Sequence, residues 1–248
     1  MLHRRIFQFL IVYIMGIGVL FGLKLALDLS DYVIPGPINV WHTGQAEFSR
    51  YVGDVLNTFA VAIVGQVLSI MMALAVGVAG RRANWFGSFI KVAAYNVQAY
   101  PIVAIAPILF ILLGDGFMTR LLIAAMICYF PLLLSVIGIM SEPVADIEHF
   151  YRATGRLRWQ LEVKIRTFEN LHKLTTVISG SATLAMAGTI VAEFIAANAG
   201  IGYSIRIALY QSDLSKILVA LFIIGITLSV YQGILELLGS ALKNAWAA

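Results

Sequence analysis

Long uncharged apolar stretches, separated by shorter polar segments, make up most of this chain. Six of these stretches are long enough to cross a bilayer as helices, which takes about 20 residues each. We place the six predicted spans at residues 6–26, 57–79, 87–113, 119–140, 174–196 and 215–238. The strands of a membrane barrel would instead give alternating segments of about ten residues, which this sequence lacks. The pattern therefore predicts an all-α integral membrane protein with six transmembrane helices.

The third apolar stretch is the least regular, because Pro101 and Pro107 lie within it. A proline lacks the N–H donor and its ring crowds the preceding turn, so we expect a kink in this helix. Asn96 and Gln98 come just before Pro101, at membrane depth, where an unpaired polar group is costly. Two interpretations stay open at this point. The helix either packs with its amides bonded to neighbours, or lines a translocation path.

The composition agrees with a membrane protein. Hydrophobic residues make up 60% of the 248 residues, charged residues make up 12%, and the mean hydropathy is +0.90. Soluble domains carry about 25% charged residues, and a soluble chain of this composition would expose large apolar patches and aggregate. The N-terminal apolar run is longer than the core of a cleaved signal peptide, so we expect a retained first span.

Lysine and arginine are distributed unevenly over the loops, and cytoplasmic loops are the ones enriched in both. With the N-terminus inside, twelve of the 17 basic residues fall on the inner side and five on the outer side. The inner residues are Arg4, Arg5, Arg81, Arg82, Lys91, Arg152, Arg156, Arg158, Lys164, Arg166, Lys173 and Lys243. The outer residues are Lys24, Arg50, Arg120, Arg206 and Lys216. We therefore expect both termini in the cytoplasm.

The inner segment YRATGRLRWQLEVKIRTFENLHK, residues 151–173, is long, basic and compatible with a helix. One Arg or Lys at the centre of a membrane helix costs roughly 2.5–3.5 kcal/mol, so this segment stays out of the lipid. Gly155 interrupts the helical run and fits a position where one helix ends and another begins. A short helix, a glycine turn and a second helix would form an elbow suited to protein docking. A helix resting on anionic headgroups is the alternative.

Four stretches, in order, carry a resemblance to one family. They are YVIPGPINVW, VQAYPIVAIAPILFILLGDG, TGRLRWQLEVKI and VAEFIAANAGIGYSI. Together they resemble the membrane subunits of bacterial binding-protein-dependent ABC importers of the type I (MetI-like) class. Within this class the chain is most similar to the permeases for sulfonate, taurine, nitrate and thiamine precursors. The first stretch resembles a Pro-x-Pro element followed by a short helix ahead of the second span.

The resemblance implies three regions. They are a first transmembrane helix with a periplasmic segment at 1–53, a type I transmembrane domain at 54–240 and a cytoplasmic tail at 241–248. An ATPase-docking (coupling) loop is expected near 142–172. Its docking residues would be Phe150, Tyr151, Arg152, Gly155, Arg156, Arg158 and Trp159. Aromatic side chains and arginine are also the types enriched at interface hot spots.

The docking loop departs from the family signature E-A-A-x-x-x-G. Aligned on Gly155, the E-A-A positions hold His149, Phe150 and Tyr151. The usual prolines of this loop are replaced by Phe168 and His172. The departure suggests altered docking contacts, with an unusual ATPase or with a second, more typical permease as the partner.

Glu193 lies near the outer end of the fifth span, and an ionisable group at membrane depth is a functional hypothesis by default. It either contacts substrate, or pairs with Arg206, or caps the turn GIGYS. This periplasmic turn, which includes Gly200, Gly202 and Tyr203, has two glycines that permit positive φ. A short outer helix is expected after it. The residues assigned to a translocation path or gate are Asn96, Gln98, Pro101, Pro107 and Glu193.

The expected function is the permease subunit of an ATP-driven importer in the bacterial inner membrane. The solute would be small, anionic or like a vitamin precursor. The expected partners are a cytoplasmic ATPase dimer that uses ATP and magnesium, a second permease copy or paralogue, an extracytoplasmic binding protein and membrane lipid. We expect no nucleic acid, and no cofactor, metal or catalytic site on this chain, because phosphate-loop and nucleophile motifs are missing from the sequence. A stand-alone carrier or channel is the alternative, although no midplane acid supports it.

Overall fold

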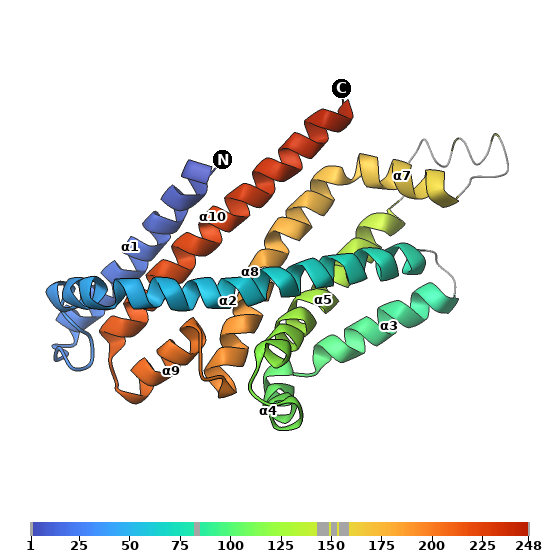
Figure 1. The fold of residues 1–248 in the computed structure, drawn as a ribbon. Coiled ribbons are helices and arrows are strands. Elements are labelled where there is room, and N and C mark those ends of the chain that lie inside the picture. Colours follow the sequence, from blue (N-terminus) through green and yellow to red (C-terminus); the bar gives the residue numbers. More distant parts are fainter. Residues whose placement is uncertain (1, 82–84, 143–148, 150–152, 154–158, 248) are drawn as a thin grey trace.

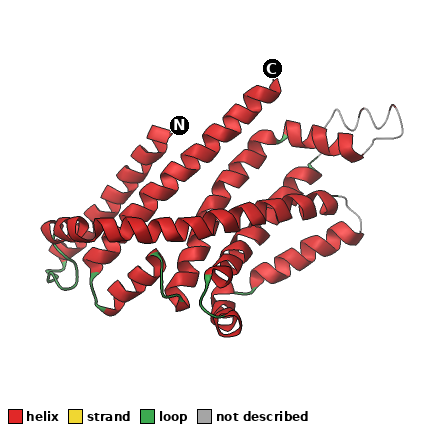
Figure 2. Cartoon of the chain, in the orientation of Figure 1, coloured by secondary structure: helices red, strands yellow, loops and turns green. Residues whose placement is uncertain are grey.

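The computed structural model describes residues 2–81, 85–142, 149, 153 and 159–247, and this part of the chain is helical (Figures 1 and 2). The helices are α1 (Leu2–Ala26), α2 (Pro37–Gly80), α3 (Trp85–Ala99), α4 (Ile102–Leu113), α5 (Phe117–Ser141), α7 (Trp159–Glu169), α8 (Leu171–Ala196), α9 (Ile201–Tyr210) and α10 (Leu214–Ala247). Figure 1 shows both termini at the same end of the bundle as α7, with α4 and α9 at the opposite end. We call these the α7 end and the α9 end.

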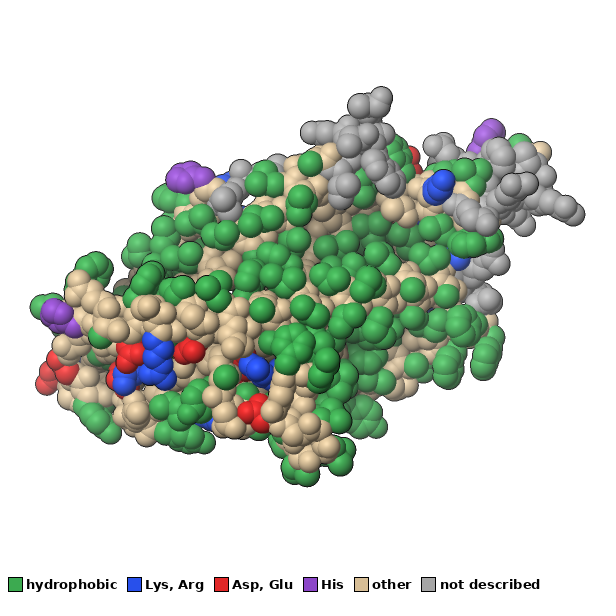
Figure 3. Space-filling view, viewed as in Figure 1, with side chains coloured by type: hydrophobic (Ala, Val, Ile, Leu, Met, Phe, Trp, Pro, Cys, Tyr) green, Lys and Arg blue, Asp and Glu red, His purple; other side chains and the backbone are tan. Residues whose placement is uncertain are grey.

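Helices α1, α2, α5, α8 and α10 are each long and apolar enough to cross a membrane. The pair formed by α3 and α4 makes a sixth span if it is counted as one. Five of the six spans predicted from hydrophobic runs are therefore confirmed as single long helices, and the third is a pair of shorter helices. Apolar side chains cover much of the face shown in Figure 3, as expected for a surface that meets lipid.

The expectation of a short helix ahead of the second span is wrong. A single helix, α2, begins with Pro37 in its first turn and continues for 44 residues. At 1.5 Å per residue it is about 66 Å long, roughly twice the thickness of the hydrocarbon core. No proline follows Pro37 within this helix, so nothing in the sequence forces a break.

The third predicted span is broken rather than only kinked. Helix α3 ends at Ala99, α4 begins at Ile102, and the two axes differ by 84°. Pro101 is the N-cap of α4 with an extended backbone (φ −68°, ψ 103°), and it cannot donate the hydrogen bond that would continue α3. Pro107 lies inside α4 without ending it. The predicted kink is thus confirmed at the first proline, with a larger bend than expected.

Small residues allow the central helices to approach closely. Helix α2 packs against α5, α8 and α10, and α5 packs against α8. At Gly65 on α2 an added Cβ would lie 3.2 Å from the Ala124 Cβ, and at Gly188 on α8 it would lie 3.1 Å from the Ala124 Cα. Since lipid gives no hydrophobic drive for helix association, such close contacts are a main source of packing energy in membranes.

Helix α1 is held along α10. The Tyr13 hydroxyl donates to the Leu218 carbonyl at 2.9 Å, and the Arg5 guanidinium binds the Glu236 carboxylate and Gln232. The first and last predicted spans therefore lie side by side, which the sequence pattern did not indicate.

Candidate functional site

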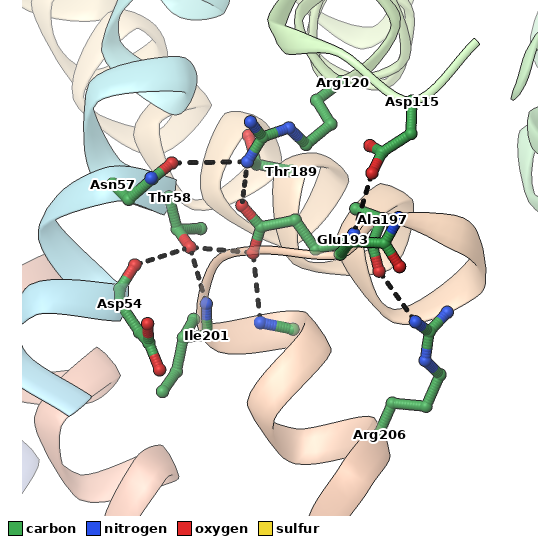
Figure 4. Close-up of polar contacts among 12 residues, drawn as sticks. Asp54, Asn57, Thr58, Asp115, Arg120, Thr189, Glu193, Ala197, Ile201 and Arg206 are labelled. Atoms are coloured by element: carbon green, nitrogen blue, oxygen red, sulfur yellow. Dashed lines mark hydrogen bonds and ion pairs between the residues drawn. The ribbon is translucent and has the colours of Figure 1, made fainter. Parts of the chain in front are cut away.

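A largely buried polar cluster joins four helices at the α9 end. Figure 4 shows Glu193 of α8 pointing toward α2, α5 and α9. Its carboxylate is fully buried, as is the side chain of Thr58 on α2. We call Asn57, Thr58, Arg120, Glu193 and the backbone of 201–202 the outer cluster.

Each oxygen of the Glu193 carboxylate has hydrogen-bond donors. The Thr58 hydroxyl lies 2.7 Å from Oε2, and the backbone N–H of Gly202 donates to the same oxygen at 3.0 Å. The Arg120 guanidinium donates to Oε1 at 3.3 Å. A carboxylate buried in this way is tolerated because charge and hydrogen bonds replace the water it has lost.

Thr58 and Arg120 extend these contacts. The N–H of Ile201 donates to the Thr58 hydroxyl oxygen at 2.9 Å, which fixes the start of α9 against α2. Arg120 also donates to the Asn57 side-chain oxygen at 3.3 Å. Nearby, the Ser204 hydroxyl donates to the Asp54 carboxylate at 2.6 Å. Polar bonds therefore tie the middle of α2 to the ends of α5, α8 and α9.

The turn between α8 and α9 needs glycine for two separate reasons. Gly200 has φ +93°, a region that L side chains rarely adopt, and a Cβ there would meet the Glu193 carboxylate. At Gly202 the backbone instead approaches α8 closely, where a Cβ would meet the Ile190 carbonyl oxygen. The Asn198 N–H donates to Asp115 at 3.0 Å, which anchors the turn to the α4–α5 connection.

The structure decides between two of the predicted contacts of Glu193. The predicted cap of the turn GIGYS is confirmed by the bond from Gly202. The predicted pairing with Arg206 is wrong, because Arg206 donates to the carbonyls of Phe194 and Ala197 while Arg120 binds Glu193. The expected short outer helix is present as α9. Sequence reasoning missed Thr58 and Arg120, although Arg120 was visible as a charge at the edge of an apolar run.

A second polar group lies deep among α2, α8 and α10. The buried Gln66 amide donates to the Ile178 carbonyl at 2.9 Å and to the Ser181 hydroxyl at 3.0 Å. The Tyr231 hydroxyl donates to the Gln66 side-chain oxygen at 2.7 Å. Interhelical bonds of this kind fix the register of membrane helices. In the sequence this polar group is indicated by Gln66, a single amide side chain within a long apolar run.

The predicted path residues of the third span do not join the outer cluster. Asn96, Gln98, Pro101 and Pro107 are all exposed at the surface of the chain. Within the part of the chain that the structure describes, neither amide has a hydrogen-bond partner. As far as the described residues extend, the structure therefore gives no support to the interpretation in which these amides bond to neighbouring helices.

Most of the predicted docking residues lie outside the described part of the chain, and the last of them, Trp159, lies at the α7 end. Phe150, Tyr151, Arg152, Gly155, Arg156 and Arg158 lie outside the described residues. Trp159 begins α7 and is 52% exposed. Helix α7 is the second helix that the elbow prediction required. It ends at Glu169, and the next span begins directly after Asn170, whose amide donates to the Arg166 carbonyl at 3.1 Å.

Among the described residues, no group of three or more His, Cys, Asp or Glu side chains could hold a metal ion. The model of the family described as "Binding-protein-dependent transport system inner membrane component" matches residues 57–244. The chain belongs to this family. The predicted resemblance is therefore confirmed, together with the fold class and the location in the inner membrane.

Two relatives of this inner membrane component are permeases. The riboflavin transport system permease protein RibX of Chloroflexus aurantiacus is 38% identical over 146 residues, covering 56% of this chain and 53% of the relative. The aligned part thus spans about half the length of that relative. The formylaminopyrimidine transport permease protein ThiX of Halalkalibacterium halodurans is 22% identical over 202 residues, covering 79% of each chain.

Proposed function

We propose that this inner membrane component is the permease subunit of an ATP-driven importer for a small solute. The observation that carries the proposal is the family match, which extends over five of the six spans. The α7 end would face the cytoplasm, in keeping with its excess of lysine and arginine. There the loop near 142–172 would dock on a cytoplasmic ATPase dimer that hydrolyses ATP.

We infer that the solute is a flat nitrogen heterocycle, such as a vitamin or a vitamin precursor. The two relatives are named for riboflavin and for formylaminopyrimidine, and both compounds belong to this class. An extracytoplasmic binding protein would deliver the solute at the α9 end. The start of α2 and helix α9 form the surface available to it.

The first prediction concerns the energy source. Reconstituted in liposomes with the ATPase that copurifies with it, the permease should take up labelled riboflavin or formylaminopyrimidine only when ATP is present. The reason is that the spans carry no midplane acid to couple transport to an ion gradient. Replacing ATP by ADP is the control. Equal uptake by the permease alone would instead identify a carrier or channel.

We further propose that the break between α3 and α4 lines the translocation path, which a second permease copy or paralogue completes. The exposed amides of Asn96 and Gln98 and the interrupted backbone need polar partners. Lipid offers none, and non-helical backbone at membrane depth is tolerated only within protein or beside water. Glu193 and the outer cluster would hold the outer gate of this path.

The second prediction tests the path and the orientation by cysteine labelling. A thiol reacts mainly as the thiolate, which forms readily only in contact with water. Gln98→Cys should therefore react with a small water-soluble reagent in the assembled transporter. Asn39→Cys should react with an impermeant reagent added outside.

The matched control is Ile111→Cys on α4. Ile111 is 83% exposed in the isolated chain but would face lipid, so its cysteine should stay unlabelled. The native Cys128 is buried and adds no background. Equal labelling at Gln98 and Ile111 would contradict the aqueous path, and labelling of Asn39 from the inside alone would reverse the orientation.

A further inference from the structure

Charged side chains at the α7 end form a compact cluster that joins three helices. The Glu162 carboxylate on α7 lies between two guanidinium groups. It accepts from Arg81, at the end of α2, at 3.2 Å, and from Arg166 on α7 at 3.3 Å. Arg166 also donates to the carbonyl of Glu142, directly after α5. We call Arg81, Glu162 and Arg166 the inner clamp.

The inner clamp is shielded from water. Its three side chains are 7%, 17% and 15% exposed for Arg81, Glu162 and Arg166, respectively. Shielded ion pairs are screened less by salt, and removing one partner leaves a charge without compensation. The backbone around Arg81 is held as well, since the Ser141 hydroxyl donates to its carbonyl at 3.0 Å.

Among the described residues, few apolar side chains attach helix α7 to the bundle: Val163 and Ile165 are half-buried, and the other three are exposed. Trp159, Leu161 and Phe168 are 52%, 44% and 47% exposed, so apolar burial holds this helix only weakly. Along the chain α7 continues into α8 through Asn170, whereas α2 lies far away in the sequence. Within the described part of the chain, the ion pair from Glu162 to Arg81 therefore ties α7 directly to α2.

We propose that the inner clamp is the link that passes movement of the docking loop to α2. This inference rests on the proposed function, in which an ATPase moves that loop. Without the clamp, α7 would still pull α8, to which it is joined covalently. Helix α7 would no longer carry α2 along with it. Because α2 carries Thr58 and Asn57 of the outer cluster near its middle, the clamp connects the ATPase side to the outer gate.

The test uses the full permease–ATPase complex in nanodiscs with a reporter cysteine, Asn198→Cys, in the exposed turn before α9. Two quantities are measured: ATP hydrolysis, and the change in reporter labelling between the nucleotide-free and the vanadate-trapped state. In Glu162→Gln we expect hydrolysis to continue while the labelling change falls by about tenfold, within the range of coupling between distant sites. The double variant Arg81→Gln/Glu162→Gln should reduce the labelling change no further than Glu162→Gln does, since both remove the same link.

Lys173→Gln is the matched control, because its pair with Glu142 lies at the same end but is about half exposed. Such exposed pairs contribute little, so this variant should keep the full labelling change. Amide hydrogen exchange distinguishes a loss of the α7 attachment from misfolding of the whole permease. In Glu162→Gln the α7 amides should exchange faster, with those of α8 unchanged. If Glu162→Gln is not recovered folded, Arg81→Lys takes its place. It keeps the charge but loses the guanidinium fork, so its labelling change should be smaller than that of the parent.

A labelling change in Glu162→Gln equal to that of the parent would overturn the inference, as would an equal loss in Lys173→Gln. If the parent complex hydrolyses no ATP, or shows no labelling change on trapping, the proposed function fails instead, and the clamp loses its role with it. Measurements on the parent complex therefore distinguish failure of the proposed function from failure of the clamp inference.

Discussion

Glu193→Gln is expected to lower the free energy of unfolding by about 3 kcal/mol, because it leaves the Arg120 guanidinium largely buried without a counter-charge. The Arg120 side chain is 11% exposed, and Asn57 is its other acceptor in the outer cluster. A glutamine keeps the size and one acceptor oxygen of Glu193. The loss in free energy of unfolding therefore measures the effect of the missing charge rather than a change in packing. Thermal unfolding of the purified permease in detergent measures it.

The matched control is Glu47→Gln. Glu47 pairs with Arg50 at 3.5 Å on the exposed side of α2, and exposed pairs contribute about 0–1 kcal/mol. The double variant Arg120→Gln/Glu193→Gln should recover part of the stability, because no unpaired charge remains. If its cost equalled the sum of the two single costs, Arg120 and Glu193 would not act as a pair.

Gly202→Ala is expected to destabilise the protein by about 2 kcal/mol, since overpacking typically costs 1–3 kcal/mol. The added Cβ would meet the Ile190 carbonyl oxygen and would lie 2.7 Å from the Glu193 Cβ. Backbone atoms cannot move aside as a flexible side chain can, so α9 would shift away from α8. For a chain of this size the midpoint of thermal unfolding should fall by about 4–8 °C.

Gly180→Ala on α8 is the control for this substitution. An added Cβ there would have no neighbour within 4 Å, and alanine favours the helix by up to about 1 kcal/mol. Its midpoint should therefore stay the same or rise. A fall at Gly180 as large as that at Gly202 would mean that helix packing in general, rather than the close approach of α9, sets the cost.

Both substitutions also bear on transport. The outer cluster fixes α9 against α2, α5 and α8, so loosening it should let the turn at Asn198 move away from these helices. In the proposed transporter this turn faces the binding protein. A permease with a weakened outer cluster should leak solute when ATP is withheld.

The sequence alone determined the helical fold and five long spans, because a run of about 20 apolar residues crosses a membrane whatever its neighbours are. It also determined that the third span is irregular, since Pro101 lacks the donor needed to continue a helix. The order of the four family-like stretches was sufficient to identify the family. All of these are local properties of the chain.

Only the tertiary structure decided which charges meet. The sequence predicts that both Arg120 and Arg206 lie on the outer side. In the structure, Arg120 binds Glu193, whereas Arg206 binds backbone carbonyls. Likewise, nothing near Arg81 in the sequence indicates that Glu162 is its partner. The physical reason is that an ion pair depends on how helices pack and rotate about their axes, and these angles result from contacts spread over the whole bundle.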